Sequence, residues 1–402
     1  MANNTLSNAK DAKRDEFYTQ FSDIQREINA YIDFDKDVFR GKTILLPCDD
    51  PEWSNFTKFF AQNFETFGIK KLISTSYAHN SKKVEFDYQP TLFETIDPRF
   101  EISKSKSKGK IFTLTADENK DGKINIDDLK FDYLNGDGDF RSEEVKVLRD
   151  EADIIITNPP FSLFREFVAW LVESNKKFLI LGNPNLLSKR DIFPLFQKNM
   201  IWCGCKSMSE DSYFIIPEQY KQRLLKENKE GSGYKIIDGN VYGRTQAMWY
   251  TNLEHGRRHE PIQLMSMDDN IKFSKHKKNE KWDYAYKTFE NYNAIEIPYI
   301  DAIPKDYQGI MAVPISFMGQ YCPEQFEIIG RTGDIDWCTT NCEFFTPCTD
   351  IEKNRLKKLN KTWRIQNAYM LENEKPKTFY DRIFIRFTNN WKQSNTSDFG
   401  DK

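Results

Sequence analysis

Four consecutive residues, Asn158-Pro159-Pro160-Phe161, have the side chains and spacing to hold an amino group attached to a flat ring. Asn158 offers an amide carbonyl, and Pro159 offers a backbone carbonyl in a residue that has no N–H. Phe161 offers a ring face for stacking. Two acceptors that converge on one NH2 would polarise it for attack on an electrophile. A purely structural Asn-Pro turn is the alternative, so the flanking elements have to decide between the two readings.

The sequence around this turn predicts a strand, the turn, a helix and a second strand. The apolar run 153–157 is typical of a strand buried on both faces of a parallel sheet. Residues 163–172 carry apolar side chains at the i, i+3, i+4 spacing of an amphipathic helix, and 178–181 form a second apolar run. Two prolines cannot donate to a β-ladder, so the first strand ends at the turn. Ligands of open α/β sheets bind beyond the carboxyl ends of the strands, where this turn would lie.

Two earlier turns carry groups suited to a small polar ligand. Tyr18-Thr19 precedes a segment predicted to be helical to about Phe34; the pair could supply a hydroxyl and helix amides to a ligand, or could be a plain helix cap. The buried strand 43–46 runs into Asp49-Asp50, and acids at the end of a first strand can accept from a ribose or bind an ammonium group. A helix from residue 54 to 67 and a strand over 71–74 follow. The absence of a GxGxxG motif weakens a dinucleotide-dependent oxidoreductase reading.

Residues 80–135 are predicted to be an insertion that contains a β-hairpin of 110–115 and 123–126. The loop between these two strands also has the spacing of an EF-hand calcium site, with candidate ligands Asp117, Asn119, Asp121 and Asp128. A strand-like segment precedes the loop and its twelfth position is Asp, so the hairpin is favoured and no metal is predicted. Shortly after, Asp139-Phe140 could accept from and pack on a purine, although an ordinary acidic turn fits equally well.

Length and composition predict two domains, 1–253 and 254–402, in a chain of 402 residues. A polar N-terminus and the lack of any apolar run of 18 residues predict a cytoplasmic protein. The seven cysteines are an odd number without a secretory signal, which favours reduced thiols. Cys338, Cys342 and Cys348, with Cys322 nearby, could bind zinc, but no close CxxC pair supports this.

Charge is distributed unevenly along the chain. Residues 117–153 hold 13 acidic and 6 basic residues, whereas 353–392 hold 11 basic and 3 acidic residues. A second basic-leaning stretch runs from 255 to 278. Each run alone is typical of a solvated face. Together, with aromatic residues interleaved in the C-terminal run, they favour a nucleic-acid surface.

The ordered motifs resemble those of the EcoRI-type adenine-specific DNA methyltransferases, a family of N6-adenine amino-methyltransferases. The resemblance covers about residues 15–330 and lies in DEFYTQ (15–20), CDDPEWSNFTKFFAQNF (48–64), GDGDFRS (136–142), TNPPFSLF (157–164), FIIPEQY (214–220), WYTNL (249–253) and GIMAVPISFMGQYCPEQFEIIG (309–330). It implies a Rossmann-like S-adenosylmethionine-dependent methyltransferase fold over 1–253, followed by a C-terminal α+β target-recognition region over 254–402.

The resemblance also implies roles for individual residues. S-adenosylmethionine would be bound by Phe17, Tyr18, Thr19, Cys48, Asp49, Asp50, Asp139 and Phe140. The target adenine would be held by Asn158, Pro159, Pro160 and Phe161, with Phe214 or Trp249 on its second face. DNA would be bound by Arg141, Arg257, Arg258, Lys353, Arg355, Lys357, Lys358 and Lys361. One departure is the segment after the second strand, which lacks the acid that many methyltransferases use for the ribose.

The predicted activity is site-specific methylation of N6 of an adenine flipped out of double-stranded DNA. The setting would be restriction-modification or DNA protection in a bacterium or a phage, with any cognate endonuclease on a separate chain. Methylation of RNA or of a protein glutamine remains an alternative, because NPP[FY] serves such enzymes too. A non-catalytic DNA-binding protein is the other alternative.

Overall fold

A computed structural model describes residues 18–50, 54–78, 100–208, 210–216, 218–227, 229–231, 233–278, 286–333, 344–346, 349–359, 368–372, 375–379 and 381–395. The chain divides into two compact units. The first comprises Met1–Pro184 and Ile201–Gly256, and the second comprises Asn185–Met200 and Arg257–Lys402. The division near residue 256 lies close to the predicted domain boundary, but the segment 185–200 belongs to the second unit.

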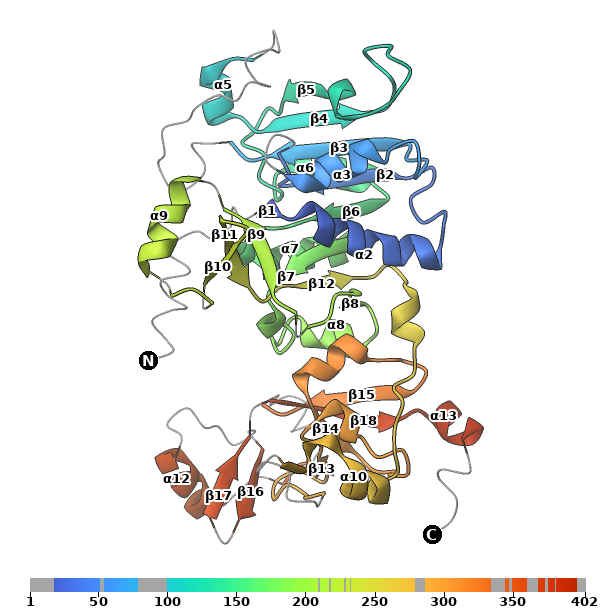
Figure 1. The fold of residues 1–402 in the computed structure, drawn as a ribbon, viewed down its shortest axis with the longest axis vertical. Helices are drawn as coiled ribbons and strands as arrows, with labels where there is room; N and C mark the ends of the chain where they lie inside the picture. The colour runs from blue at the N-terminus through green and yellow to red at the C-terminus, as the bar shows by residue number, and fades with distance from the viewer. Residues whose placement is uncertain are drawn as a thin grey trace. The chain divides into compact units, whose positions relative to one another are not determined.

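The first unit is built on an eight-stranded mixed sheet (Figure 1). Its order is β5 (Lys130–Tyr133), β4 (Lys110–Leu114), β3 (Lys71–Ser76), β2 (Thr43–Pro47), β6 (Ile154–Thr157), β7 (Lys177–Gly182), β12 (Met248–Thr251) and β8 (Trp202–Cys203). The central strands β3, β2, β6 and β7 are parallel, and the outer strands pair antiparallel. Every residue of β2 and β6 is buried, which confirms the strands predicted from the two apolar runs.

Among its described residues, the helices of this unit are α2 (Phe21–Phe34), α3 (Asn55–Gln62), α5 (Ile102–Ser107), α6 (Glu143–Glu151), α7 (Phe164–Glu173) and α9 (Glu218–Glu227). Residues Ile24 and Ile28 of α2 share one core with Ile44 of β2 and Ile156 of β6, and α2 crosses the near face of the sheet in Figure 1. A short 3-10 helix, η4 (Phe161–Leu163), leads from the NPPF turn into α7, as the apolar spacing predicts.

A second, four-stranded sheet of this unit has the order β1 (Tyr18–Thr19), β9 (Ser212–Ile215), β11 (Asn240–Thr245) and β10 (Tyr234–Ile237). Its strands pair antiparallel throughout. Asp238 and Gly239, both at positive φ, form the two-residue turn between β10 and β11. The two-residue strand β1 joins this sheet to the start of α2, so the N-terminal segment is positioned by a distant part of the chain.

The insertion does contain a hairpin, but its predicted second strand is wrong. β4 pairs with β5, not with residues 123–126, and η3 (Ile126–Asp128) occupies the end of that stretch. The side chains of Asn125 and Asp128 form a capping box on η3, which satisfies backbone groups that a strand would have paired. Asp117 and Asp128 accept hydrogen bonds from the N–H groups of their own loop.

The second unit is a separate α+β body. Its four-stranded sheet has the order β13 (Ile295–Glu296), β14 (Met311–Pro314), β18 (Arg382–Phe387) and β15 (Phe326–Arg331), and β16 (Tyr369–Glu372) pairs with β17 (Lys375–Thr378). Its helices are α8 (Phe193–Gln197), α10 (Met267–Phe273), α12 (Asp350–Leu359) and α13 (Asn389–Ser394). Over the described parts of both units, no helix combines the length and apolar character that a membrane crossing needs.

Candidate active site

The candidate site lies where two parallel strands end side by side. β2 pairs with β3 on one side and with β6 on the other, so the direction in which the sheet grows reverses between β2 and β6. Such a reversal leaves a crevice beyond the carboxyl ends of the two strands. Cys48 follows β2 at this edge, and Asn158 follows β6. The sheet therefore brings together the first-strand acids and the NPPF turn, as the sequence predicts.

Backbone contacts hold the turn after β2 tightly. Cys48 adopts a left-handed conformation with φ 82°. The N–H groups of Cys48 and Asp49 both donate to Thr75 O, at 3.0 and 2.9 Å. The carbonyl of Asp49 accepts from the hydroxyls of Ser74 and Thr57. Burial raises the pKa of the Cys48 thiol, so this sulfur stays protonated.

The carboxyl group of Asp49 joins the two turns. It is 3% exposed, with Oδ1 2.6 Å from Ser54 Oγ and Oδ2 2.5 Å from Thr157 Oγ1. Thr157 Oγ1 also lies 2.5 Å from Pro47 O. The Thr157 hydroxyl has one hydrogen, and the Pro47 carbonyl can only accept a hydrogen bond. If Thr157 donates its hydrogen to Pro47, its contact with Asp49 needs a second hydrogen, which a protonated Asp49 would supply.

Burial independently raises the pKa of Asp49 to about 7, with a smaller contribution from the charge of Asp50. Both carboxyl oxygens of Asp49 form hydrogen bonds within the protein, so Asp49 links the turn after β2 to the residue that precedes the NPPF turn. The direct contact of Asp49 with a cofactor stays a prediction. Asp50 is more exposed, and its Oδ2 lies 3.5 Å from Lys110 Nζ.

The NPPF turn is less completely buried than the first turn, although the side-chain oxygen of Asn158 is itself enclosed. Asn158, Pro160 and Phe161 are partly exposed, and Pro159 is buried. Thr157, the residue directly before Asn158, is completely buried and tied to the first turn through Asp49. The turn is thus rigid because of its two prolines and because its preceding residue is anchored.

The N-terminal segment reaches this edge through Thr19. Asn55 Nδ2, at the first position of α3, donates to Thr19 O at 2.8 Å. The side chain of Thr19 is 4% exposed, and its hydroxyl oxygen has no hydrogen-bond partner among the residues that the structure describes. Phe17 lies outside the described residues, and of Tyr18 only the backbone is described. Thr19 is therefore a buried polar side chain whose hydroxyl is not satisfied by any residue that the structure describes.

The loop 135–139 lies against the carboxyl end of β3. Ala78 N donates to Asp137 O at 2.7 Å, and Gly138 approaches Ser76 O so closely that a side chain would not fit. The loop thus delivers acidic residues to the strand end that lacks one in the sequence. Arg141 binds Asp139 through two hydrogen bonds, of 2.6 and 2.9 Å, and holds the pKa of that carboxyl below its usual value. The sequence singles out Asp139, but the backbone contact between this loop and the end of β3 joins residues about 60 positions apart and follows from no local pattern.

Phe140 is 3% exposed and packs edge-on against Phe167 and Trp170 of α7. A groove that Arg141 and Glu166 also line opens beside it. The ring of Phe140 is one of the groups that line this groove and has little free surface, and its packing on a purine stays a prediction.

Neither residue predicted for the second face of the base has an accessible ring in this structure. Phe214 and Trp249 are each 1% exposed and belong to the core of the first unit. The reason is alternation: in β9 the side chains of Ser212 and Phe214 face inward, whereas Tyr213 and Ile215 face outward. The period-2 pattern of β9 could have shown this for Phe214, whereas every residue of β12, Trp249 included, is buried. The ring on the second face of the base stays a prediction.

The predicted DNA-binding residues separate into surface and buried groups. Arg258 is 7% exposed and donates to Asn199 Oδ1 at 2.8 Å, so its guanidinium is largely enclosed within the second unit and its contact with DNA stays a prediction. Arg257 is half-buried. Arg141 is half-exposed but pairs with Asp139 and Glu166.

Helix α12 carries the remaining basic side chains. Arg355, Lys357 and Lys358 are exposed while Leu356 is buried, so the helix shows a basic face. Lys353 is half-buried, with its Nζ 3.9 Å from Asp350 Oδ1. Lys361 lies outside the described residues.

Within the described ranges, no group of three His, Cys, Asp or Glu residues could hold a metal ion. The calcium alternative at Asp117, Asn119, Asp121 and Asp128 falls in these ranges and gains no support. Cys338, Cys342 and Cys348 lie outside them. The thiol of Cys322 donates to Glu324 Oε2 at 3.2 Å.

Comparisons with known proteins agree with the kind of site that the geometry indicates. The profile of a family described as "Adenine-specific methyltransferase EcoRI" matches residues 5–388. The chain is 36% identical over 334 residues to Type II methyltransferase M.EcoRI of Escherichia coli, which covers 83% of this chain and 91% of that protein. It is 32% identical over 327 residues to Type II methyltransferase M.MpnI of Mycoplasma pneumoniae, covering 81% and 84%. A third relative, Type II methyltransferase M.MgeORF184P of Mycoplasma genitalium, is 31% identical. No solved structure gives a significant match.

Proposed function

Because this chain belongs to the adenine-specific methyltransferase EcoRI family, we propose that it transfers a methyl group from S-adenosylmethionine to N6 of an adenine in double-stranded DNA. The observation that carries the proposal is the Asn158-Pro159 turn at the reversal point of the sheet, where buried Asp49 and Thr157 anchor it. A rigid pair of acceptors at such an edge suits an amino group better than it suits a hydroxyl or a carbonyl.

The residues at this edge fit the proposed methyl donor. S-adenosylmethionine supplies an electrophilic methyl group on a positively charged sulfur. The buried hydroxyl of Thr19, which has no partner in the described part of the chain, is a polar group that such a ligand would satisfy. Asp50, at the first-strand turn, and Asp137, in the loop that lies against the carboxyl end of β3, offer carboxylates for its ammonium and ribose groups.

For the acceptor, Asn158 and Pro159 would take the two N6 hydrogens of the adenine and shift its lone pair toward the methyl group. A base in a duplex cannot reach this turn, so it has to flip out at a cost of a few kcal/mol. Stacking on the partly exposed ring of Phe161 offsets part of that cost, and the basic face of α12 supplies contacts to the backbone.

The test compares methyl acceptors. Purified protein with tritiated methyl donor is expected to label duplex DNA and to leave RNA and protein unlabelled. Single-molecule sequencing of DNA from expressing cells would then identify the base and its sequence context. Tritium in a protein glutamine or in RNA would show that the NPPF turn acts on an amino group other than N6 of adenine in DNA. DNA binding without calorimetric binding of S-adenosylmethionine would favour a non-catalytic DNA-binding protein.

The relatives are named as Type II methyltransferases, which suggests a role in restriction-modification with a cognate endonuclease on a separate chain. DNA methylated by this protein should then resist an endonuclease of the same recognition sequence. Cleavage at the methylated sequence would separate the activity from that role.

A further inference from the structure

We propose that Lys206 is a positioning residue for the methyl donor, because its buried ammonium ties the first turn of α2 to the start of β9 and so fixes Thr19 at the site. This inference rests on the proposed function. It concerns a residue that lies outside the two turns and outside every motif that the sequence singled out.

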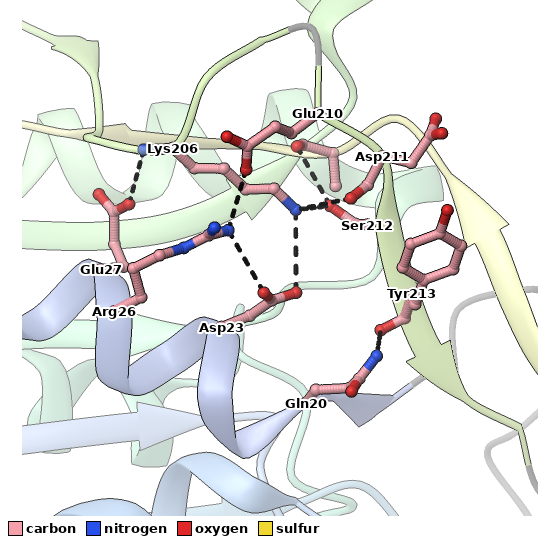
Figure 2. Close-up of polar contacts among 10 residues, drawn as sticks. Gln20, Asp23, Arg26, Glu27, Lys206, Glu210, Asp211, Ser212 and Tyr213 are labelled. Carbon is pink, nitrogen blue, oxygen red and sulfur yellow. Dashed lines mark hydrogen bonds and ion pairs between the residues drawn. The ribbon is translucent and has the colours of Figure 1, made fainter. Parts of the chain in front are cut away.

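The ammonium of Lys206 is enclosed by groups from two elements. Its side chain is 3% exposed, and Nζ lies 2.5 Å from Ser212 Oγ, 3.2 Å from Asp211 O and 3.8 Å from Asp23 Oδ2 (Figure 2). Ser212 begins β9, and Asp23 lies in the first turn of α2. Lys206 therefore connects the two elements that flank strand β1.

Glu27 holds the Lys206 loop to α2 from a second direction. Its carboxylate accepts from the backbone N–H of Cys205 at 2.7 Å and of Lys206 at 2.9 Å, as well as from the hydroxyl of Tyr31. Glu27 is 1% exposed, and Gly204 packs so closely on it that any side chain at 204 would clash. The ammonium thus starts from a fixed backbone, which gives its contacts a defined geometry.

The segment held in this way is short and cannot define its own position. β1 has two residues, with Thr19 opposite Phe214 of β9. Directly after it, Gln20 Nε2 donates to Tyr213 O at 2.8 Å. Figure 2 shows Gln20, Asp23 and Glu27 on the side of α2 that faces β9 and the Lys206 loop. Displacement of α2 by loss of the ion pair would move Thr19, which is attached to its first turn.

A buried cation is a costly way to join two elements. Replacement of a buried ion pair by apolar residues of similar volume is often neutral or stabilising. Burial lowers the pKa of Lys206, and the nearby carboxylate of Asp23 opposes this. The Lys206 ammonium instead fixes the distance and the orientation of α2 relative to β9, because its hydrogen bonds and ion pair have a defined geometry. Loss of the charge should therefore affect the site more than it affects the fold.

The test is Lys206→Met, which keeps the stem and removes the charge. We expect the KM for S-adenosylmethionine and its calorimetric Kd to rise about tenfold, while kcat and the Kd for DNA change less than about twofold. Asp23→Asn removes the other half of the pair, is partly exposed, and should shift the same two constants in the same direction. It also keeps the test informative if Lys206→Met fails to fold.

Lys71→Met is the matched control. Lys71 Nζ pairs with Glu151 at 2.6 Å in the same unit, but Lys71 begins β3, at the opposite end of the sheet from the site. This variant should leave both donor constants unchanged. Folded Lys206→Met and Asp23→Asn proteins with wild-type KM and Kd for S-adenosylmethionine would overturn the proposal. A wild-type protein that binds no S-adenosylmethionine would instead overturn the proposed function itself.

Discussion

The turns after β2 and β6 leave the same edge of one sheet, yet they use their polar groups in opposite ways. In the first turn, both carboxyl oxygens of Asp49 and the N–H groups of Cys48 and Asp49 are bonded within the protein. In the second turn, two prolines have no N–H to satisfy, and Asn158 and Phe161 are partly exposed. The first turn therefore acts as a scaffold, and we propose that the second turn holds the amino group of the substrate. The hydrogen bond between Asp49 and Thr157 is where the scaffold supports the second turn.

The largest effect should come from Asn158→Ala. Loss of one positioned polar contact to the reacting group is expected to lower kcat about 10²–10³-fold while the Kd for DNA stays near wild type. Tritiated-methyl transfer and fluorescence anisotropy measure the two quantities. Asn63→Ala is a matched control, since that half-buried amide caps α3 and donates to Phe59 O. Wild-type turnover of the Asn158 variant would remove the distinction between the two turns.

Asp49→Asn tests the scaffold turn through pH. The pKa of Asp49 is about 7 in the folded protein, against a reference value of 3.8 for the unfolded chain. Between pH 3.8 and about pH 7, the carboxyl group is therefore protonated in the folded state and ionised in the unfolded state. Wild-type stability from this group is therefore complete below pH 4 and is lost as pH rises through 7. Relative to Asp49→Asn, wild type should lose on the order of 3 kcal/mol between pH 5 and pH 8.

Urea unfolding of wild type and Asp49→Asn at several pH values gives the difference in their unfolding free energies. The titration of all other groups is common to both proteins and cancels in this difference. The two curves of unfolding free energy should converge toward acid pH and diverge toward alkaline pH. Parallel curves would mean that Asp49 is already ionised and that it is not the proton donor to Thr157. Methyl transfer by Asp49→Asn should persist, because the amide can still donate to Thr157 Oγ1.

Phe161→Ala should have a smaller effect than Asn158→Ala on turnover and should act on the acceptor. Stacking of a base on an aromatic ring is worth about 1–3 kcal/mol, so kcat/KM for DNA should fall about 5- to 150-fold. Fluorescence of 2-aminopurine at the target position reports the flipped base directly. Phe161→Tyr keeps the stacking surface and should stay near wild type. Equal flipping by the alanine variant would show that another ring holds the base.

Much of this architecture follows from local patterns. The buried runs at 43–46 and 153–157 and the phenylalanine-rich helix that begins after Ser54 depend on periodicity and caps, and the structure confirms them. The helix predicted over 54–67 is shorter than expected, because α3 ends at Gln62 and turns follow to Gly68. The placement of both turns at one edge followed from the parallel order of strands. These are the features that neighbouring residues determine.

The rest depends on contacts between distant parts of the chain. No local pattern shows that Asp49 would form a hydrogen bond with Thr157, 108 positions away, or that Lys206 would lie beside Asp23. The second strand of the hairpin was misplaced because Asn125 and Asp128 cap a 3-10 turn that alternation does not reveal. Arg258 was read as a surface cation because its partner, Asn199, comes from a segment almost 60 residues earlier.

The smallest expected effect, and the one that separates chemistry from delivery, concerns the basic face of α12. Lys358→Glu should weaken DNA binding and make the plot of log K against log salt less steep by about 1, because one phosphate contact contributes about 0.9 to the slope. Lys357→Glu should do the same, while the saturating kcat stays near wild type. The turn variants should show the reverse, with altered turnover and an unchanged slope.

Lys36→Glu controls for net charge in this last experiment. That side chain is exposed next to Asp35 and Asp37, so it changes the charge of the protein by the same amount in surroundings unsuited to a phosphate. If affinity fell equally for Lys36→Glu and Lys358→Glu, only the total field of the protein would matter, and α12 would have no direct contact with DNA. If the slope of log K against log salt changes only in the α12 variants, these lysines neutralise DNA phosphates directly. Each such contact releases a fixed number of counterions, so losing one contact changes the slope by a fixed amount.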